Sequence, residues 1–235
     1  MITAIVNNSR VFPAPKILGN CPYCGTGVRS KCGSINTWHF AHLNLQETCD
    51  YWKEHESEWH REWKSWFPLE NTEFIKIENE EKHIADVHSD NFILELQNSP
   101  ISYENRIMRE KFWGMKLRWI VKSDFERFKL LLFEREKEKE QCRNRRQQQN
   151  PPRVCFAYYG EQFKEMITEE LPLMWIWKNP KRWITTAPPS HFYIDLTGSN
   201  FILLVNKVLE NNFGFGVLKD RPTFISNLKN SINGG

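Results

Sequence analysis

The stretch HIADVHSDNFILELQ, His83–Gln97, has the alternation typical of two short strands joined by a tight turn. Asp90 and Asn91 both tolerate left-handed backbone angles, so they suit a two-residue hairpin loop. Counting outward from that loop places Asp86 opposite Glu95, with side chains about 5 Å apart at Cβ. Like charges in that position are destabilising. We therefore expect a cation between them, and carboxylate oxygens suit Mg²⁺ or Mn²⁺.

The two faces of the second strand differ in polarity. Gln97 lies two residues beyond Glu95 and projects from the same face, whereas Phe92, Leu94 and Leu96 point the other way, into a core. The alternative to a metal site is a half-buried hairpin whose polar face simply meets water, because any antiparallel strand shows this alternation.

Size and composition narrow the class of protein. A chain of 235 residues suffices for one large domain or two small ones. Its net charge of +3 does not identify a nucleic-acid binder, so any phosphate-binding surface must be local. We expect no membrane span, since no run of 18 apolar residues occurs, and no signal peptide. Six cysteines with irregular spacing suit a metal site in a reducing, cytoplasmic compartment better than a disulfide framework.

A cysteine and histidine pattern near the N-terminus predicts a zinc site. The CPYCG motif at 21–25 is followed by HFAH at 39–42, and CxxC with HxxH supplies four ligands for tetrahedral Zn²⁺. The short HxxH gap favours a ribbon-like module over a DNA-reading finger. Cys32 and Cys49 are further thiols that could replace either histidine. The alternative is buried apolar cysteines and hydrogen-bonded histidines. The expected ligands are Cys21, Cys24, His39 and His42.

Residues 51–67 have the periodicity of an amphipathic helix that ends at Pro68. A buried stripe is formed by four tryptophans, Trp52, Trp59, Trp63 and Trp66. Glu56, His60 and Lys64 follow one another at helical spacing beside that stripe, where they would reach a neighbouring hairpin. Glu58 falls on nearly the opposite face, so Glu56 is the expected inward carboxylate. The alternative is an exposed ladder of charges worth a few tenths of a kcal/mol.

The elements around the hairpin complete an α/β pattern. Residues 72–78 and 117–121 are expected strands, and Ser102 is a good N-cap for a helix over 103–115. That helix carries Arg106, Arg109 and Lys111, which would meet a phosphate backbone or else form a solvated face. The order helix, three strands, helix, strand describes an α/β sandwich with a mixed sheet.

Taken in order, these motifs resemble the competence protein CoiA-like nuclease family of the PD-(D/E)xK superfamily. The resemblance covers roughly residues 20–122 and rests on CPYC, HFAH, SEWHREWK, IADV, ILELQNSPIS and LRWIV. It implies a restriction-endonuclease-like mixed sheet flanked by helices, with a zinc-ribbon-like module before it. It also implies a metal-dependent phosphodiesterase site that acts on DNA.

The resemblance assigns roles to individual residues. Asp86 corresponds to the motif aspartate and Glu95 to the motif acid. Gln97 stands where the superfamily usually has lysine, and Ala85 where it has proline. His60 and Lys64 match the family's His-x-x-x-Lys pattern, and the later positions are matched by Ser99, Ser102 and Arg109.

The chemistry expected of such a site is hydrolysis of phosphodiester bonds. Asp86 and Glu95 would hold one or two Mg²⁺, which lower the pKa of a bound water and neutralise the oxyanion. Gln97 would orient the water or phosphate, and Glu56 would complete the metal shell. The phosphate contacts would come from His60, Lys64, Arg106 and Arg109.

The last part of the chain carries weaker signals. Residues 123–150 are highly charged, with Phe125, Phe128, Leu131 and Leu132 at helical spacing, which predicts a solvated helix or linker. Beyond the boundary at 147–152 we expect an α+β region with segments at 163–167, 173–178, 191–197 and 201–209, and a frayed end at 231–235. Trp175, Trp177 and Trp183 would form either an aromatic core or a base-stacking surface. The predicted division is therefore 1–50, 51–122, 123–150 and 151–235.

The sequence favours an Mg²⁺-dependent DNA nuclease with a structural zinc ribbon, in DNA uptake, recombination or defence. Recombination or defence proteins are possible partners, and no membrane is expected. One alternative is a nucleic-acid-binding protein that keeps the nuclease fold without turnover, which Gln97 would explain. Another is a zinc-stapled module that binds only proteins.

Overall fold

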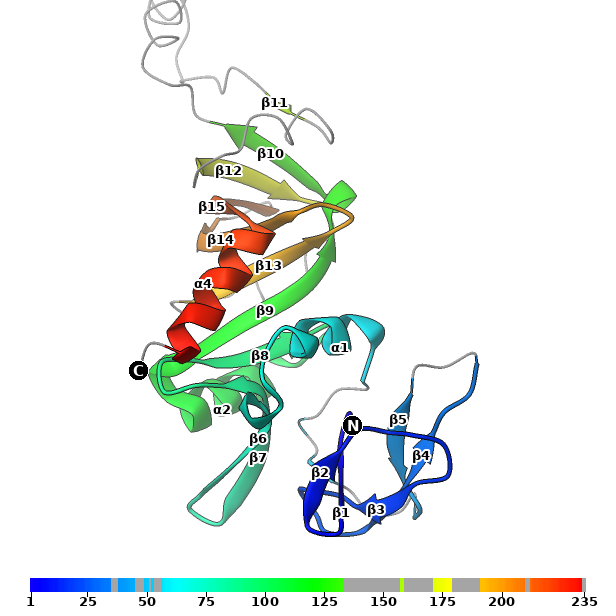
Figure 1. Ribbon diagram of the computed structural model, residues 1–235. Helices are drawn as coiled ribbons and strands as arrows, with labels where there is room; N and C mark the ends of the chain where they lie inside the picture. The colour runs from blue at the N-terminus through cyan, green and yellow to red at the C-terminus, as the bar shows by residue number, and fades with distance from the viewer. Residues whose placement is uncertain are drawn as a thin grey trace, which may run out of the picture. The chain divides into compact units, whose positions relative to one another are not determined.

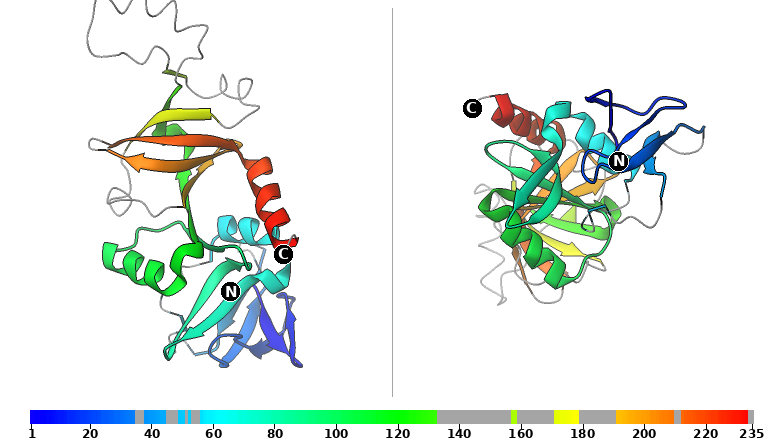
Figure 2. Two further views of the ribbon diagram at one scale, coloured as in Figure 1. Left: turned by 90° about the vertical axis from the view of Figure 1, so that its left-hand side faces the viewer. Right: turned by 90° about the horizontal axis from the view of Figure 1, so that it is seen from below.

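The computed structural model describes residues 1–34, 38–44, 49–50, 52, 56–132, 157–158, 171–178, 191–209 and 212–233. The chain divides into two compact units, Met1–Ser89 and Asp90–Gly235. Figures 1 and 2 show their strands and helices from three sides. Nothing in the described part of the chain forms a helix long and apolar enough to span a membrane.

The first unit begins with a small antiparallel sheet in the order β2-β1-β3-β4-β5. Asn7 and Asn8 join β1 to β2 with φ angles of 49° and 63°, the left-handed pair that a tight hairpin needs. The sheet covers a core of Ala4, Cys21, Val28 and Phe40. Its strands are β1 (Ala4–Val6), β2 (Ser9–Val11), β3 (Leu18–Asn20), β4 (Gly27–Lys31) and β5 (His39–His42).

A helix and a hairpin complete the first unit: α1 (Glu58–Ser65), η1 (Leu69–Asn71), β6 (Thr72–Glu78) and β7 (Glu81–His88). The strand predicted at 72–78 is confirmed. The helix is shorter than predicted because Ser57 caps it, accepting a hydrogen bond from the backbone N–H of His60. Residues 51 and 53–55 lie outside the described part. Trp59 and Trp63 are buried, as the periodicity predicts.

The second unit holds a mixed sheet in the order β11-β10-β12-β15-β14-β13-β9-β8. β9 runs parallel to both β8 and β13, and the other neighbours are antiparallel. Its elements are β8 (Ile93–Gln97), α2 (Tyr103–Trp113), η2 (Gly114–Lys116), β9 (Leu117–Asp124), η3 (Phe125–Arg127), β10 (Phe128–Leu132), β11 (Ala157–Tyr158), β12 (Leu171–Trp177), β13 (Phe192–Thr197), β14 (Phe201–Val208), β15 (Phe213–Asp220) and α4 (Arg221–Asn233).

The helix predicted from Ser123 is wrong in its described part, where β9 runs on to Asp124 and β10 follows. Phe128 and Leu130 are buried and pair with Trp177 and Trp175 of β12. Burial at every second residue is the period of a strand, and these long-range partners are invisible to a local reading. Residues 133–150 lie outside the described part.

The C-terminal segments are partly as predicted. Strands are found at the segments 173–178, 191–197 and 201–209, while 163–167 and Trp183 lie outside the described residues. The sequence missed β15 and α4, and the expected frayed end is helical as far as Asn233, because Phe224 and Leu228 of that helix are buried. Trp175 and Trp177 are each 1% exposed, so they form an aromatic core.

The described residues therefore confirm a mixed α/β protein with a large mixed sheet. The strands expected at the two ends of the stretch His83–Gln97 are β7 and β8. The register expected between Asp86 and Glu95 crosses the boundary between the two units and stays a prediction. The restriction-endonuclease-like assignment and the four-part division also stay predictions.

Candidate metal centre and carboxylate clusters

Three cysteines and one histidine of the first unit form a compact cluster. The ligand atoms of Cys21, Cys24, His42 and Cys49 all lie within 4.8 Å of one another. Cys21 and Cys24 come from the turn between β3 and β4. There Gly25 adopts a φ of 76° and donates its N–H to the Cys21 carbonyl oxygen at 2.9 Å. This left-handed glycine lets the turn close tightly enough for both thiols to face one point.

The separations fit a tetrahedral metal. The Sγ atoms of Cys21 and Cys49 are 3.7 Å apart, and Cys24 Sγ lies 3.3 Å from His42 Nε2. Zn–S bonds of about 2.3 Å and Zn–N bonds of about 2.0–2.1 Å require edges of about 3.8 Å and 3.6 Å. The shared hydrogen bond lowers the pKa of the Cys21 thiol and, with burial, raises that of Cys49. Two sulfurs held this way suit one soft cation, so the cluster could bind a metal such as zinc.

His39, an expected ligand, lies outside this cluster, and Cys49 takes its place. Both histidines of HFAH lie on β5, where residues three apart point to opposite faces. His42 shares its face with the buried Phe40, which packs in the core beside the cysteines. An HxxH pair presents both rings to one ion on a helix but not on a strand.

The loops that carry the cysteines are fastened to β7. The Tyr23 hydroxyl, inside the CPYC turn, donates to the Lys82 carbonyl oxygen, and the Lys82 ammonium donates to the Tyr23 carbonyl oxygen. Next to Cys49, Asp50 accepts the backbone N–H of Ile84 at 2.7 Å and lies 3.0 Å from His83 Nδ1. The Cys₃His cluster is therefore coupled to the strand that carries Asp86.

A buried lysine organises the carboxylates of the first unit. Lys64 is 2% exposed, and its Nζ lies 3.0 Å from Asp86 Oδ1, 3.1 Å from Glu56 Oε2 and 3.6 Å from Glu73 Oε1. Burial alone would lower the pKa of Lys64, but the charges of the three carboxylates outweigh it and raise that pKa. Lys64 is therefore a charged ammonium in a cage of acids, which we call the Lys64 cage.

The sequence anticipated part of this cage. Glu56 faces inward and Glu58 is exposed, as predicted. Glu73 was missed because it belongs to a regular-looking strand. Its φ of 48° is rare for a residue other than glycine. The pairing of β6 with β7 skips Glu73, passing from Thr72–Val87 to Phe74–Ala85.

His60 has a local role in the structure. Its Nδ1 lies 2.7 Å from Ser57 Oγ and accepts the Ser57 backbone N–H, so it completes the cap of α1. The side chain is buried at 3% exposure. Its predicted contact with a phosphate stays a prediction.

A second cluster lies within the other unit. The Arg109 guanidinium on α2 contacts Glu95 Oε2 at 3.4 Å and Gln97 Oε1 at 3.5 Å. Gln97 also donates through Nε2 to the Ser99 carbonyl oxygen at 2.7 Å and is fully buried. The predicted catalytic Glu95 and Gln97 are thus brought together, with Arg109 between them.

Three of the predicted phosphate-binding cations are buried, whereas Lys111 is exposed. Lys64 and Arg106 are each 2% exposed and Arg109 is 5% exposed. Each is paired with a carboxylate, and Arg106 Nε lies 3.1 Å from Glu110 Oε1. A charge that is buried needs such a partner, so these residues position acids in this structure. Their contact with DNA stays a prediction.

These observations define an α/β protein with a Cys₃His cluster that could bind a metal such as zinc, and with buried acid clusters. Residues 20–51 match the family model for the N-terminal domain of competence protein CoiA, so the chain is CoiA-like over that segment. The matched residues include all four members of the metal cluster. No curated protein and no solved structure shows a significant match to the chain.

Proposed function

We propose that this protein is a metal-dependent nuclease that hydrolyses phosphodiester bonds in DNA, in a competence-related pathway of uptake, recombination or defence. The CoiA match and the order of the motifs support it. The observation that carries it is the Lys64 cage, because buried acids arranged around a fixed charge are typical of functional sites. A merely structural role would be met more cheaply by apolar packing.

The donor chemistry around Asp86 fits a hard divalent cation. Its side chain is 17% exposed, against 6% for Glu56 and 5% for Glu73, so Asp86 is the most accessible acid of the cage. Carboxylate oxygens suit Mg²⁺ or Mn²⁺. The proposal assigns metal binding to Asp86 and Glu95. The bound ion would activate water and neutralise charge that develops on the phosphate.

Two cations of the protein would position these acids and favour their charged form. Lys64 Nζ lies 3.0 Å from Asp86 Oδ1, and Arg109 contacts Glu95 Oε2 at 3.4 Å, and a nearby opposite charge favours a charged carboxylate. Gln97 holds Arg109 in place through its amide oxygen. In this scheme the charge of the usual superfamily lysine is replaced by cations on two helices, α1 and α2.

Cleavage assays test the proposal. Linear, circular, single-stranded and branched DNA would be incubated with Mg²⁺, with Mn²⁺ or without either ion, while the zinc content is kept constant. Metal-dependent cutting is expected. It should fall at least a hundredfold in Asp86→Asn and Glu95→Gln. Glu58→Gln and Asp90→Asn, which alter exposed acids, should cut normally. Equal cutting by all four variants would contradict the assignment.

One observation favours a second candidate. Lys64 already occupies the carboxylates of the first unit, as would suit a nucleic-acid-binding protein without turnover. Salt-dependent DNA binding with no cutting under any metal condition would identify that alternative.

A further inference from the structure

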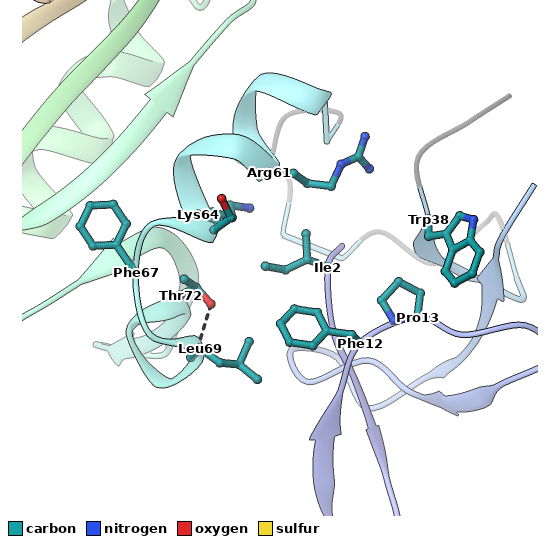
Figure 3. Close-up of a pocket in the computed structure, with 10 residues that line it drawn as sticks. Ile2, Phe12, Pro13, Trp38, Arg61, Lys64, Phe67, Leu69 and Thr72 are labelled. Atoms are coloured by element: carbon teal, nitrogen blue, oxygen red, sulfur yellow. Dashed lines mark hydrogen bonds between the residues drawn. The ribbon is translucent and has the colours of Figure 1, made fainter. Parts of the chain in front are cut away.

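A cavity of about 420 Å³ lies within the first unit, beside α1 (Figure 3). Its wall is largely apolar and aromatic, with Ile2, Phe12, Trp38 and Phe67, and it is completed by the two cations Arg61 and Lys64. The volume lies at the lower end of the range of about 300–1,000 Å³ for small-molecule sites. It suits one planar group rather than a packed secondary-structure element.

Two of the aromatic rings at this cavity are unusually exposed. Phe12 is 59% exposed and Trp38 is 46% exposed. Each belongs to a segment beside a short strand, Phe12 directly after β2 and Trp38 directly before β5. Exposed rings that flank a hollow offer flat apolar faces to a flat ligand.

Arg61 supplies the polar recognition. Its Nε is buried and has no hydrogen-bond partner among the described residues. Figure 3 shows the side chain reaching from α1 toward the side of the cavity where Trp38, Pro13 and Phe12 lie. Thr72, another lining residue, already has a hydrogen-bond partner, since its Oγ1 donates to the Leu69 carbonyl oxygen at 2.8 Å. A guanidinium with donors to spare is suited to a phosphate.

The cavity also adjoins the Lys64 cage. Lys64 lines the cavity and at the same time contacts Asp86 at 3.0 Å. A ligand whose flat part fills the cavity would therefore lie beside the Lys64 cage, with an anionic part within reach of Arg61. A nucleotide combines these two parts, and a base is free to enter only when it is unpaired.

We propose that this cavity binds an unpaired base of single-stranded DNA, stacked against Phe12 and Trp38, with its phosphate on Arg61. The inference rests on the proposed function and names its substrate class. It selects single strands, flaps or frayed ends over intact duplex, because a paired base would have to be extruded first at a cost of a few kcal/mol.

Binding of fluorescein-labelled oligothymidine, followed by anisotropy without added Mg²⁺, tests this. Single strands should bind more tightly than a duplex of equal length. Phe12→Ala and Trp38→Ala should each weaken single-strand binding about 5- to 100-fold, the usual effect of losing one stacking ring. Ile77→Ala, at a residue that is 69% exposed on the β6–β7 hairpin, should leave it unchanged. Both rings are exposed, so the thermal unfolding midpoints should change little.

Arg61→Gln adds a separate measure. It should reduce the slope of log affinity against log salt by about 0.7–1, the signature of one lost phosphate contact. Arg29→Gln, at an exposed arginine on β4, controls for net charge and should change the slope less. The proposal is overturned if the ring variants bind single-stranded DNA as tightly as the parent chain does. That result is expected if the natural ligand of this cavity is a peptide. Equal affinity for duplex and single strand also overturns the proposal.

These measurements separate the two proposals. A protein that binds single strands through Phe12 and Trp38 but never cuts DNA retains this site and loses the nuclease assignment. A protein that cuts DNA while the ring variants bind and cut normally keeps the nuclease and loses this site.

Discussion

Asp50 Oδ1 lies 3.0 Å from His83 Nδ1, and Asp50 Oδ2 accepts the backbone N–H of Ile84 at 2.7 Å. Asp50 directly follows the metal-cluster residue Cys49, whereas His83 and Ile84 begin the part of β7 that leads to Asp86. Trp52 stacks on the His83 ring with centroids 3.3 Å apart. The position of the predicted catalytic strand therefore depends on the loop that carries Cys49 of the Cys₃His cluster.

Asp50→Asn tests this link. The substitution keeps the shape but removes a charge-assisted acceptor, so the free energy of unfolding should fall by about 1.5–3 kcal/mol. Hydrogen exchange at the Ile84 amide should speed up, which mass spectrometry can follow. Asp90→Asn, at an exposed acid, should change neither. An Ile84 amide that exchanges as before would show that Asp50 does not hold β7.

The metal content distinguishes the ligands. We expect about one Zn²⁺ per chain, lost in Cys24→Ser and Cys49→Ser and kept in His39→Ala and Cys32→Ser, as elemental analysis would measure. Loss of zinc from His39→Ala with retention in Cys49→Ser would restore the ligand set expected from the sequence. Chelation of the metal should also lower the unfolding temperature and accelerate exchange along β7.

Lys64→Met should destabilise the protein strongly near neutral pH. It leaves the three carboxylates of the Lys64 cage without their shared buried cation, and breaking a buried pair costs about 3–5 kcal/mol. The folded-state pKa of Lys64 is raised. Its contribution to the free energy of unfolding is therefore complete at every pH below the pKa of lysine in the unfolded chain, and it is lost only at high pH. The deficit of the variant should therefore be largest at pH 7–8.

The same deficit should shrink toward pH 5, because without the ammonium the acids of the Lys64 cage take up protons more readily in the folded state. Urea unfolding at several pH values measures it. Lys76→Met removes an exposed pair with Glu78 and should cost less than about 1 kcal/mol. A deficit for Lys64→Met that is equally small, or that does not vary with pH, would contradict the buried cage.

Local patterns were enough for much of the fold. Strands β6, β7, β8 and β9 and helix α2 follow from alternation, caps and prolines. The inward turn of Glu56 followed from helical spacing alone. The turn at CPYCG could be predicted from its two cysteines and its glycine alone.

Features that depend on distant partners were not predictable in this way. The sequence named Cys32 and Cys49 as alternative ligands but could not choose between them, because the strand conformation of β5, which separates His39 from His42, is not evident from its four residues. Glu73 joins the Lys64 cage through an unusual φ that no composition rule signals. Helical spacing alone allows Arg109 to be a solvated cation. Its contacts with Glu95 and Gln97 of β8 become evident only from the structure. These are all tertiary effects that override a local preference.

Strand β15 was missed because its sequence, FGFGVLKD, alternates with glycine, which is poor in strands. The structure explains the glycines by close approach. A Cβ on Gly214 would overlap the Trp175 ring and the Lys207 carbonyl oxygen, and one on Gly216 would overlap the Leu204 carbonyl oxygen. Gly214 is therefore needed where Trp175 packs across the sheet, and Gly216 where β14 approaches β15.

Gly214→Ala should consequently destabilise the second unit. Backbone atoms form part of the obstruction, so side-chain rotation alone cannot relieve it, and we expect a loss of about 1–3 kcal/mol or more, as for other overpacked cores. Gly33→Ala is the matched control, since a Cβ there meets nothing within 4 Å, and it should stay within about 0.5 kcal/mol of the parent chain. Trp175→Phe in the Gly214→Ala background should recover part of the loss, because the smaller ring makes room for the methyl group. Chemical unfolding followed by circular dichroism would measure all three, and a Gly214→Ala variant as stable as Gly33→Ala would show that β12 and β15 do not approach this closely.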